Sequence, residues 1–286
     1  MFGLMGVARM SGQPNAFSPL SLFRNSEQGV WYDPSDFSTM FQDSAGTTPV
    51  TAVEQPVGLI LDKSKGLVLG PELLPVPLAG ASSGAWVVNS AGVTRNGEDS
   101  LQATLYSADA YVFATSKTYL ITLTVADFAG DPFFLRLGGG GVVGPFTANG
   151  TYSYRVNGGG SFNLSLAPWT GTPGEATITN ISVRELAGNH AIQATAAARP
   201  VVSAPAYINY DGIDDALAAT LPDLGTDATV ARAVPTVGTT ILTGQTIGAG
   251  TFTDTTDHAG LVIIDRALTA GETTALTAYL NAKAGV

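Results

Sequence analysis

The sequence predicts a mostly-β protein built from two compact units, and three observations lead to this expectation. The chain has 286 residues, more than one average domain, and 45% of them are hydrophobic, enough to build packed cores. Glycine occurs 34 times and proline 16 times, so residues that form turns frequently interrupt the β-branched sequence. Short runs alternate between apolar and polar side chains, which is the pattern of strands with one covered face. These features favour many short strands over long helices.

The charge balance and the residue types narrow the classes of partner. The formal net charge is -10, only 13% of the residues are charged, and no cluster of Lys or Arg occurs. Nucleic acids and anionic membrane surfaces attract cationic proteins, so we expect neither as a partner. No apolar run has the length needed to cross a bilayer, and we expect no membrane insertion. The chain has no cysteine, which rules out disulfides and thiolate sites.

Residues 1–30 are rich in Gly, Ser, Pro and Asn, with a few scattered apolar residues. We interpret them as an N-terminal extended arm that packs on another protein, and a loosely ordered terminus is the alternative. The chain starts with MFGLMGVARM, which lacks a basic start followed by a long apolar run. We therefore expect no secretory signal, synthesis in the cytoplasm, and release by lysis if the protein acts outside the cell.

Residues 66–186 predict a jelly roll of two sheets, because about eight strand-like runs are separated there by glycine or Asn-Gly turns. In one run, Tyr119, Ile121 and Leu123 alternate with neighbours such as Thr122 and Thr124. This alternation predicts a strand with one face toward a core. The runs are residues 85–89, 100–106, 111–114, 119–128, 133–137, 150–156, 161–166 and 176–185.

The flanking segments predict further short elements and one terminal helix. Thr269 is followed three residues later by Glu272, which is the signature of a capping box. Leu276, Tyr279 and Leu280 then fall on one face, so a helix is expected over residues 269–283. The other expected elements are a helical turn at residues 35–41 and strands at residues 57–61, 207–210, 239–242 and 261–264.

Three stretches carry resemblances to known families. Residues 31–63 (WYDPSD, then FQDSAGTTPVTA and LDK) resemble a segment of phage and prophage structural proteins, with Glu54 in place of the usual glycine. In those proteins a Gly-Asn-x-His-Ala-x-Gln-Ala-Thr run follows LDKS directly, whereas here it occurs only at residues 188–195. The resemblance therefore implies that residues 66–186 are inserted into a domain made of residues 31–65 and 187–286.

The inserted segment and the closing segment have resemblances of their own. GPELLPVPLAG with Trp86, and the final ATITNISVREL, are similar to the first and last strands of jelly-roll carbohydrate-binding modules. NYDGIDDAL and VIIDRALTAGETTALTAYL resemble concanavalin-like or laminin-G-like domains. The implied fold is a jelly-roll β-sandwich inserted into a small split concanavalin-like β domain with a short C-terminal helix.

These resemblances imply a non-enzymatic surface protein of a phage or gene-transfer-agent virion, such as a head spike, fibre or tail-tip component. It would bind host capsular or surface polysaccharide and contact other virion proteins through its arm. Weak single-site sugar binding gains from several copies, so a homo-oligomer is expected. A capsid decoration or tail assembly protein without a glycan ligand is the main alternative. A depolymerase is a third, and it would need two carboxylates facing each other across a groove.

The candidate sugar-binding residues are aromatic. Trp169, in the loop APWTGTPG, is the best candidate for a platform under a pyranose ring, and a loop anchor is the alternative. Tyr152 and Tyr154 share one face of a strand, where they would line a groove or cover the core, and we favour the core. Trp86, at the start of a strand, is interpreted as a core residue.

Acidic residues offer candidate calcium ligands. The resemblance to carbohydrate-binding modules implies a structural calcium ion, with Glu72 and Glu185 as ligands and Glu98 and Asp99 as further candidates. The acidic cluster of Asp211, Asp214 and Asp215 is interpreted as turn chemistry, with a metal, sugar or hydrolytic site as the alternative. His190 and His258 belong to no metal or triad motif, and a solvated loop is expected for His258.

Overall fold

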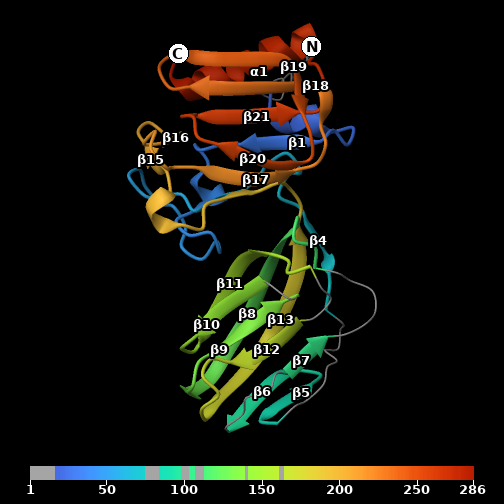
Figure 1. Cartoon of the computed structure of the whole chain (residues 1–286), viewed down its shortest axis with the longest axis vertical. Coiled ribbons are helices and arrows are strands. Elements are labelled where there is room, and N and C mark those ends of the chain that lie inside the picture. Colours follow the sequence, from blue (N-terminus) through green and yellow to red (C-terminus); the bar gives the residue numbers. More distant parts are fainter. Residues whose placement is uncertain (1–16, 75–83, 98–102, 107–112, 139–140, 161–163) are drawn as a thin grey trace, which may run out of the picture.

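A computed structural model describes residues 17–74, 84–97, 103–106, 113–138, 141–160 and 164–286. The predicted fold class is confirmed: the described chain is mostly strand, all pairings between its strands are antiparallel, and its α-helix lies at the C-terminus (Figure 1). The strands form two groups that lie one beyond the other along the long axis of the molecule (Figure 1).

The first group combines strands from both ends of the chain. Its four-stranded sheet has the order β1 (Gly29–Tyr32), β21 (Gly260–Ile264), β18 (Gly225–Val234) and β19 (Gly238–Ile247). Its five-stranded sheet has the order β2 (Met40–Phe41), β3 (Leu59–Ile60), β14 (Ala191–Ile192), β17 (Leu217–Leu221) and β20 (Gly250–Asp254). A hairpin of β15 (Val201–Ser203) and β16 (Tyr207–Asn209) adds to them.

The C-terminal helix α1 (Ala270–Ala284) covers one face of the four-stranded sheet. Central strand β21 is buried on both sides, which explains its unbroken apolar sequence: Leu261 and Ile263 pack in one core and Val262 and Ile264 pack in the core beneath α1. The expected capping box is present, since Thr269 Oγ1 accepts from Glu272 N at 3.2 Å and Glu272 Oε2 accepts from Thr269 N at 2.8 Å.

The described part of the N-terminal segment packs on the same chain. Residues 17–23 include a short 3-10 helix η1 (Pro19–Phe23), whose Leu22 and Phe23 are buried against Trp31 and the apolar face of α1. Two further 3-10 helices are η2 (Phe37–Thr39) and η3 (Ala196–Ala198). The remainder of the predicted arm, residues 1–16, lies outside the described residues.

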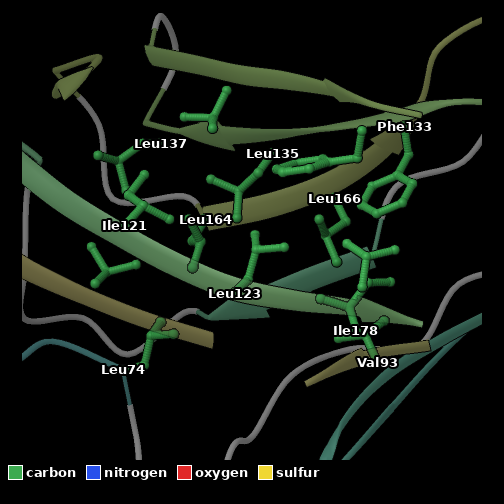
Figure 2. Packing of buried hydrophobic residues seen from close by; sticks show 14 of the residues in the cluster. Leu74, Val93, Ile121, Leu123, Phe133, Leu135, Leu137, Leu164, Leu166 and Ile178 are labelled. Atoms are coloured by element: carbon green, nitrogen blue, oxygen red, sulfur yellow. The ribbon is translucent and has the colours of Figure 1, made fainter. Parts of the chain in front are cut away.

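The second group is a two-sheet sandwich. Its six-stranded sheet has the order β11 (Gly150–Asn157), β8 (Thr118–Gly130), β13 (Gly174–Leu186), β6 (Gly92–Gly97) and β5 (Trp86–Asn89), with β4 (Leu69–Glu72) also paired to β13. Its four-stranded sheet has the order β10 (Gly141–Phe146), β9 (Phe133–Leu137), β12 (Leu164–Pro168) and β7 (Ala103–Tyr106). Figure 2 shows side chains of both sheets meeting between them, among them Ile121, Leu123, Leu135, Leu164 and Ile178.

Alternation along the strands accounts for this core. Tyr119, Ile121 and Leu123 of β8 are almost fully buried, and the residues between them are only partly buried. Trp86 is fully buried, as expected for a core residue, with its ring edge-to-face against Phe133 at 5.9 Å.

The chain leaves the first group and returns to it at the same place, and the buried carboxylate of Asp62 bonds to both of these segments. Asp62 follows β3, and its Oδ1 accepts from the backbone N–H groups of Trp31 and Ser64, each at 2.8 Å. Its Oδ2 accepts from Asn189 N at 2.8 Å, and its own N–H donates to His190 Nδ1 at 2.9 Å. Residues far apart in the sequence are therefore fixed beside each other at the junction.

A second contact joins the sandwich to the first group. Arg155 of β11 donates from its backbone N to Ala45 O at 2.7 Å and from Nη1 to Gly46 O at 3.0 Å. Its guanidinium lies over the ring of Phe41 at 4.2 Å from the centroid. An apolar cluster fills the space around the junction and consists of Phe41, Leu59, Leu61, Leu67, Leu69, Leu186 and Ile192.

Candidate functional site

Among the described residues of the sandwich, Trp169 is the most exposed aromatic residue. It follows Pro168, the last residue of β12, and 54% of its surface is exposed. Its ring contacts Phe134 edge-to-face, with 6.0 Å between the ring centroids and an interplanar angle of 87°. With about half of its surface exposed, the indole offers apolar area to a ligand.

The loop that carries Trp169 is tied to the preceding turn by hydrogen bonds. Trp169 N donates to Pro132 O at 2.8 Å, and Thr170 N donates to Asp131 Oδ1 at 3.1 Å. The Thr170 hydroxyl donates to the same carboxylate oxygen. The backbone on both sides of the indole is thus held in place, although the ring itself is open to solvent.

A buried ion pair supports the same loop from below. Arg95 Nη2 lies 3.0 Å from Asp131 Oδ2, and both side chains are almost completely buried. Arg95 also donates to Asp131 O at 2.8 Å and to Thr172 O at 3.0 Å, and it lies over the ring of Trp86. Burial opposes the charge of Asp131, but the bonds from Thr170 and Arg95 outweigh it and lower the pKa of that carboxyl.

Phe134 and Arg136 join Trp169 on one side of the four-stranded sheet. Phe133 and Leu135 point into the core and are fully buried, so the alternating residues Phe134 and Arg136 face outward. The Arg136 guanidinium lies 4.9 Å from the centroid of the Phe134 ring. We call Trp169, Phe134 and Arg136 the Trp169 surface.

Sequence reasoning identified Trp169 and missed the other two members of this surface. The signal was present in the run Phe-Phe-Leu-Arg-Leu of residues 133–137, whose second and fourth positions must share a face in a strand. Only the partner strand β12 shows that this face is the one beside Trp169, because Ala167 pairs with Phe134 and Pro168 with Phe133.

The two candidate tyrosines lie elsewhere, at the edge of the core. Tyr152 and Tyr154 stack at 6.3 Å and both pack against Phe146, at 5.0 Å and 5.7 Å. Phe146 stacks in turn on the inward-facing Phe133, whereas Trp169 contacts the outward-facing Phe134. The tyrosines are therefore on the opposite side of the four-stranded sheet from Trp169. Burial raises the pKa of Tyr154.

The candidate calcium ligands Glu72 and Glu185 both have protein donors. Glu72 Oε1 accepts from Leu73 N at 3.1 Å and from Val183 N at 2.9 Å, and its other oxygen accepts from the Ser182 hydroxyl. Glu185 pairs with Lys117 at 2.8 Å. Glu98 and Asp99 lie outside the described residues. A structural calcium ion at these positions stays a prediction from the resemblance.

Within the described part of the chain, the group of carboxylates that could hold a metal ion is Asp211, Asp214 and Asp215. Asp211 Oδ1 accepts backbone bonds from Ile213 at 2.8 Å and from Asp214 and Asp215 at 3.3 Å. The bond from Ile213 is the largest cause of a lowered Asp211 pKa. These contacts are the turn chemistry expected from the sequence.

The expected solvated loop at His258 is wrong. His258 is fully buried, and its Nε2 lies 3.1 Å from Asp254 Oδ2, while Arg232 Nη2 lies 2.8 Å from Asp254 Oδ1. Burial opposes the charge of Asp254, but His258 and Arg232 outweigh it and hold its pKa far below the usual range. The loop is tucked in because His258 and Ile208 exchange two backbone hydrogen bonds, a long-range pairing that local composition does not reveal.

No family model matches the chain, and no curated protein matches it. Among the described residues, no helix combines the length and apolar character needed to span a membrane.

Proposed function

We propose that this protein is a non-enzymatic surface component of a phage or gene-transfer-agent particle that binds host polysaccharide through the Trp169 surface. The resemblance of residues 31–63 to phage structural proteins supports the particle assignment. The observation that carries the sugar-binding part of the proposal is the exposure of Trp169 on a loop whose backbone is fixed. A 54% exposed indole offers a broad apolar surface that the ring of a sugar can cover.

The chemistry of the surface suits a sugar. An indole can cover the apolar face of a pyranose, while nearby hydroxyl and guanidinium groups bind its polar edges. The Asp131 and Arg95 bonds hold the loop before a ligand arrives, which reduces the ordering cost of binding. Several copies on one particle would strengthen weak single-site binding.

We also propose that the two strand groups are an inserted domain, residues 66–186, and a split host domain, residues 31–65 with 187–286. The strand pairings support this division, since every pairing among the described strands stays within one group. The Asp62 and His190 contacts support it as well, because they join the two host segments directly.

A purely structural role is favoured by a different surface. Val237, Leu242 and Val286 are 76%, 50% and 58% exposed, and Leu242 lies on β19, an edge strand of its sheet. Edge strands of this kind can pair with a second copy. A Leu242→Ser variant that loses the oligomeric state of the wild type in sedimentation would support assembly through this edge.

Binding to an array of bacterial capsule and cell-surface glycans tests the proposed function. Trp169→Ala should weaken binding at least about tenfold, which corresponds to about 1.4 kcal/mol. Its free energy of unfolding should change by less than about 1 kcal/mol, because the side chain is on the surface. The matched control is Ile213→Ala, an 87% exposed apolar residue of the first group, which should bind like the wild type. A folded wild type that binds no glycan overturns the proposal.

A further inference from the structure

Arg136 is an exposed cation placed beside the aromatic rings of the Trp169 surface. Its guanidinium contacts the Phe134 ring at 4.9 Å, and none of the ion pairs among the described residues includes it. Its guanidinium N–H groups donate no hydrogen bond to any of the described residues.

Of the other described arginines, six are engaged by protein acceptors, and Arg24, an exposed residue of the first group, is not. Each of the following donates to a backbone carbonyl or a carboxylate of the protein: Arg95, Arg155, Arg184, Arg199, Arg232 and Arg266. Arg95 and Arg155 also contact aromatic rings, but among the described residues Arg136 contacts its ring without donating to a protein acceptor. A ring contact limits the motion of the guanidinium without occupying its N–H groups.

We propose that the polysaccharide is acidic, and that Arg136 binds the carboxylate of a uronic acid or similar sugar while Trp169 and Phe134 contact the sugar rings. The inference rests on the proposed function and assigns its ligand class. A guanidinium presents paired N–H donors that match the two oxygens of a carboxylate, so it discriminates an acidic sugar from its neutral counterpart.

The remaining charge of the protein does not favour binding of an anionic polymer. The chain carries a formal net charge of -10, which disfavours nonspecific attraction of an anionic polymer. The neighbouring acidic group, Asp131, is neutralised by Arg95 and turned into the protein interior. Affinity for a carboxylate at this surface would therefore come from direct contact with Arg136 and not from long-range electrostatic attraction.

The test compares each acidic polysaccharide with its carboxyl-reduced form, which has the same sugar backbone with –CH₂OH in place of –COO⁻. Alginate, polygalacturonate and hyaluronate oligosaccharides serve as probes, and affinity is measured by calorimetry at about 0.15 M salt, where long-range charge is screened beyond about 8 Å. The wild type should bind at least one acidic form about tenfold more tightly than its reduced partner, which is about 1.4 kcal/mol.

Arg136→Gln should weaken binding of the acidic form more than binding of the reduced form and so remove this preference, and Arg136→Lys should retain part of it. Arg24→Gln changes the net charge equally at an exposed site in the first group and should leave the preference intact. Equal binding of both forms, or a preference that persists in Arg136→Gln, overturns the inference. In either case the proposed function is upheld if binding still depends on Trp169. A wild type that binds no glycan overturns both the inference and the proposed function.

Discussion

At the scale of single residues, the ion pair of Arg95 and Asp131 determines how the candidate site is held. Both charges are taken out of water and are compensated by each other and by loop hydrogen bonds. A buried pair of this kind is costly to break, because the remaining partner is left as an uncompensated charge in the interior. The support beneath Trp169 therefore depends on both members.

Asp131→Ala should lower the free energy of unfolding of the sandwich by about 3–5 kcal/mol, since Arg95 would stay buried without its carboxylate. Chemical denaturation monitored by tryptophan fluorescence measures the change. The matched control is Lys117→Ala, which breaks a partly exposed pair with Glu185 and should cost less than about 1 kcal/mol. Equal effects of the two substitutions would contradict the structural role assigned to Asp131.

Residue-scale prediction from sequence succeeds where the pattern is local. The burial of Trp86 and the turn bonds of Asp211 follow from neighbouring residues, and the structure agrees with both. The burial of His258 and the placement of Phe134 beside Trp169 depend on pairing between distant segments. A period of two in a strand gives the residues that share a face, but not what lies against that face.

At the scale of elements, strands β3 and β14 are joined by a histidine. His190 immediately precedes β14, and its ring accepts from Asp62 N just after β3 and contacts Leu186 O at 3.2 Å. Burial lowers the pKa of His190 from 6.5 to about 4, and the charge of Arg155 acts in the same direction. The ring is therefore neutral at pH 7 and acts as a hydrogen-bond acceptor.

This pKa predicts a loss of stability at mildly acid pH. Between pH 6.5 and about 4 the unfolded chain takes up a proton at His190 that the folded chain does not, so stability falls as pH falls through this window. The full contribution is about 3 kcal/mol, and it does not grow further below pH 4.

The measurement compares unfolding of the wild type and His190→Asn at several pH values between 7 and 4. The Asn amide oxygen offers an acceptor to Asp62 N but does not titrate. The wild type should be the more stable at pH 7, and its advantage should shrink toward pH 4, since the other titrating groups are common to both proteins. An advantage that is constant with pH would show that His190 is not the group responsible.

Element-scale prediction was accurate for strongly patterned segments. The capping box at Thr269 and the apolar run of β21 gave the terminal helix and a buried strand, because their signals lie within a few residues. The two-residue strands β2, β3 and β14 carry too few residues for a recognisable period, and they exist through pairing with one another. Such strands become visible only once the sheet is assembled.

At the scale of the whole molecule, the split-domain proposal predicts that the first group does not need the sandwich in order to fold. Its segments are joined by Asp62, whose carboxylate accepts from Trp31, Ser64 and Asn189, and none of these residues belongs to the sandwich. The sequence resemblance at LDKS and at residues 188–195 predicts a junction at these same residues. Sandwich domains whose ends lie close together are tolerated at such turns.

Joining residue 65 to residue 187 should therefore give a protein that unfolds cooperatively, as measured by circular dichroism during thermal denaturation. It should be less stable than the same domain in the full chain, because Leu59, Leu61 and Phe41 lose apolar neighbours of the junction cluster, Leu67, Leu69 and Leu186 among them. Asp62→Ala in the shortened chain should prevent folding, since it leaves several buried backbone N–H groups unpaired. A shortened chain that shows no cooperative transition would mean that the two groups fold as one unit, and the insertion proposal would be wrong.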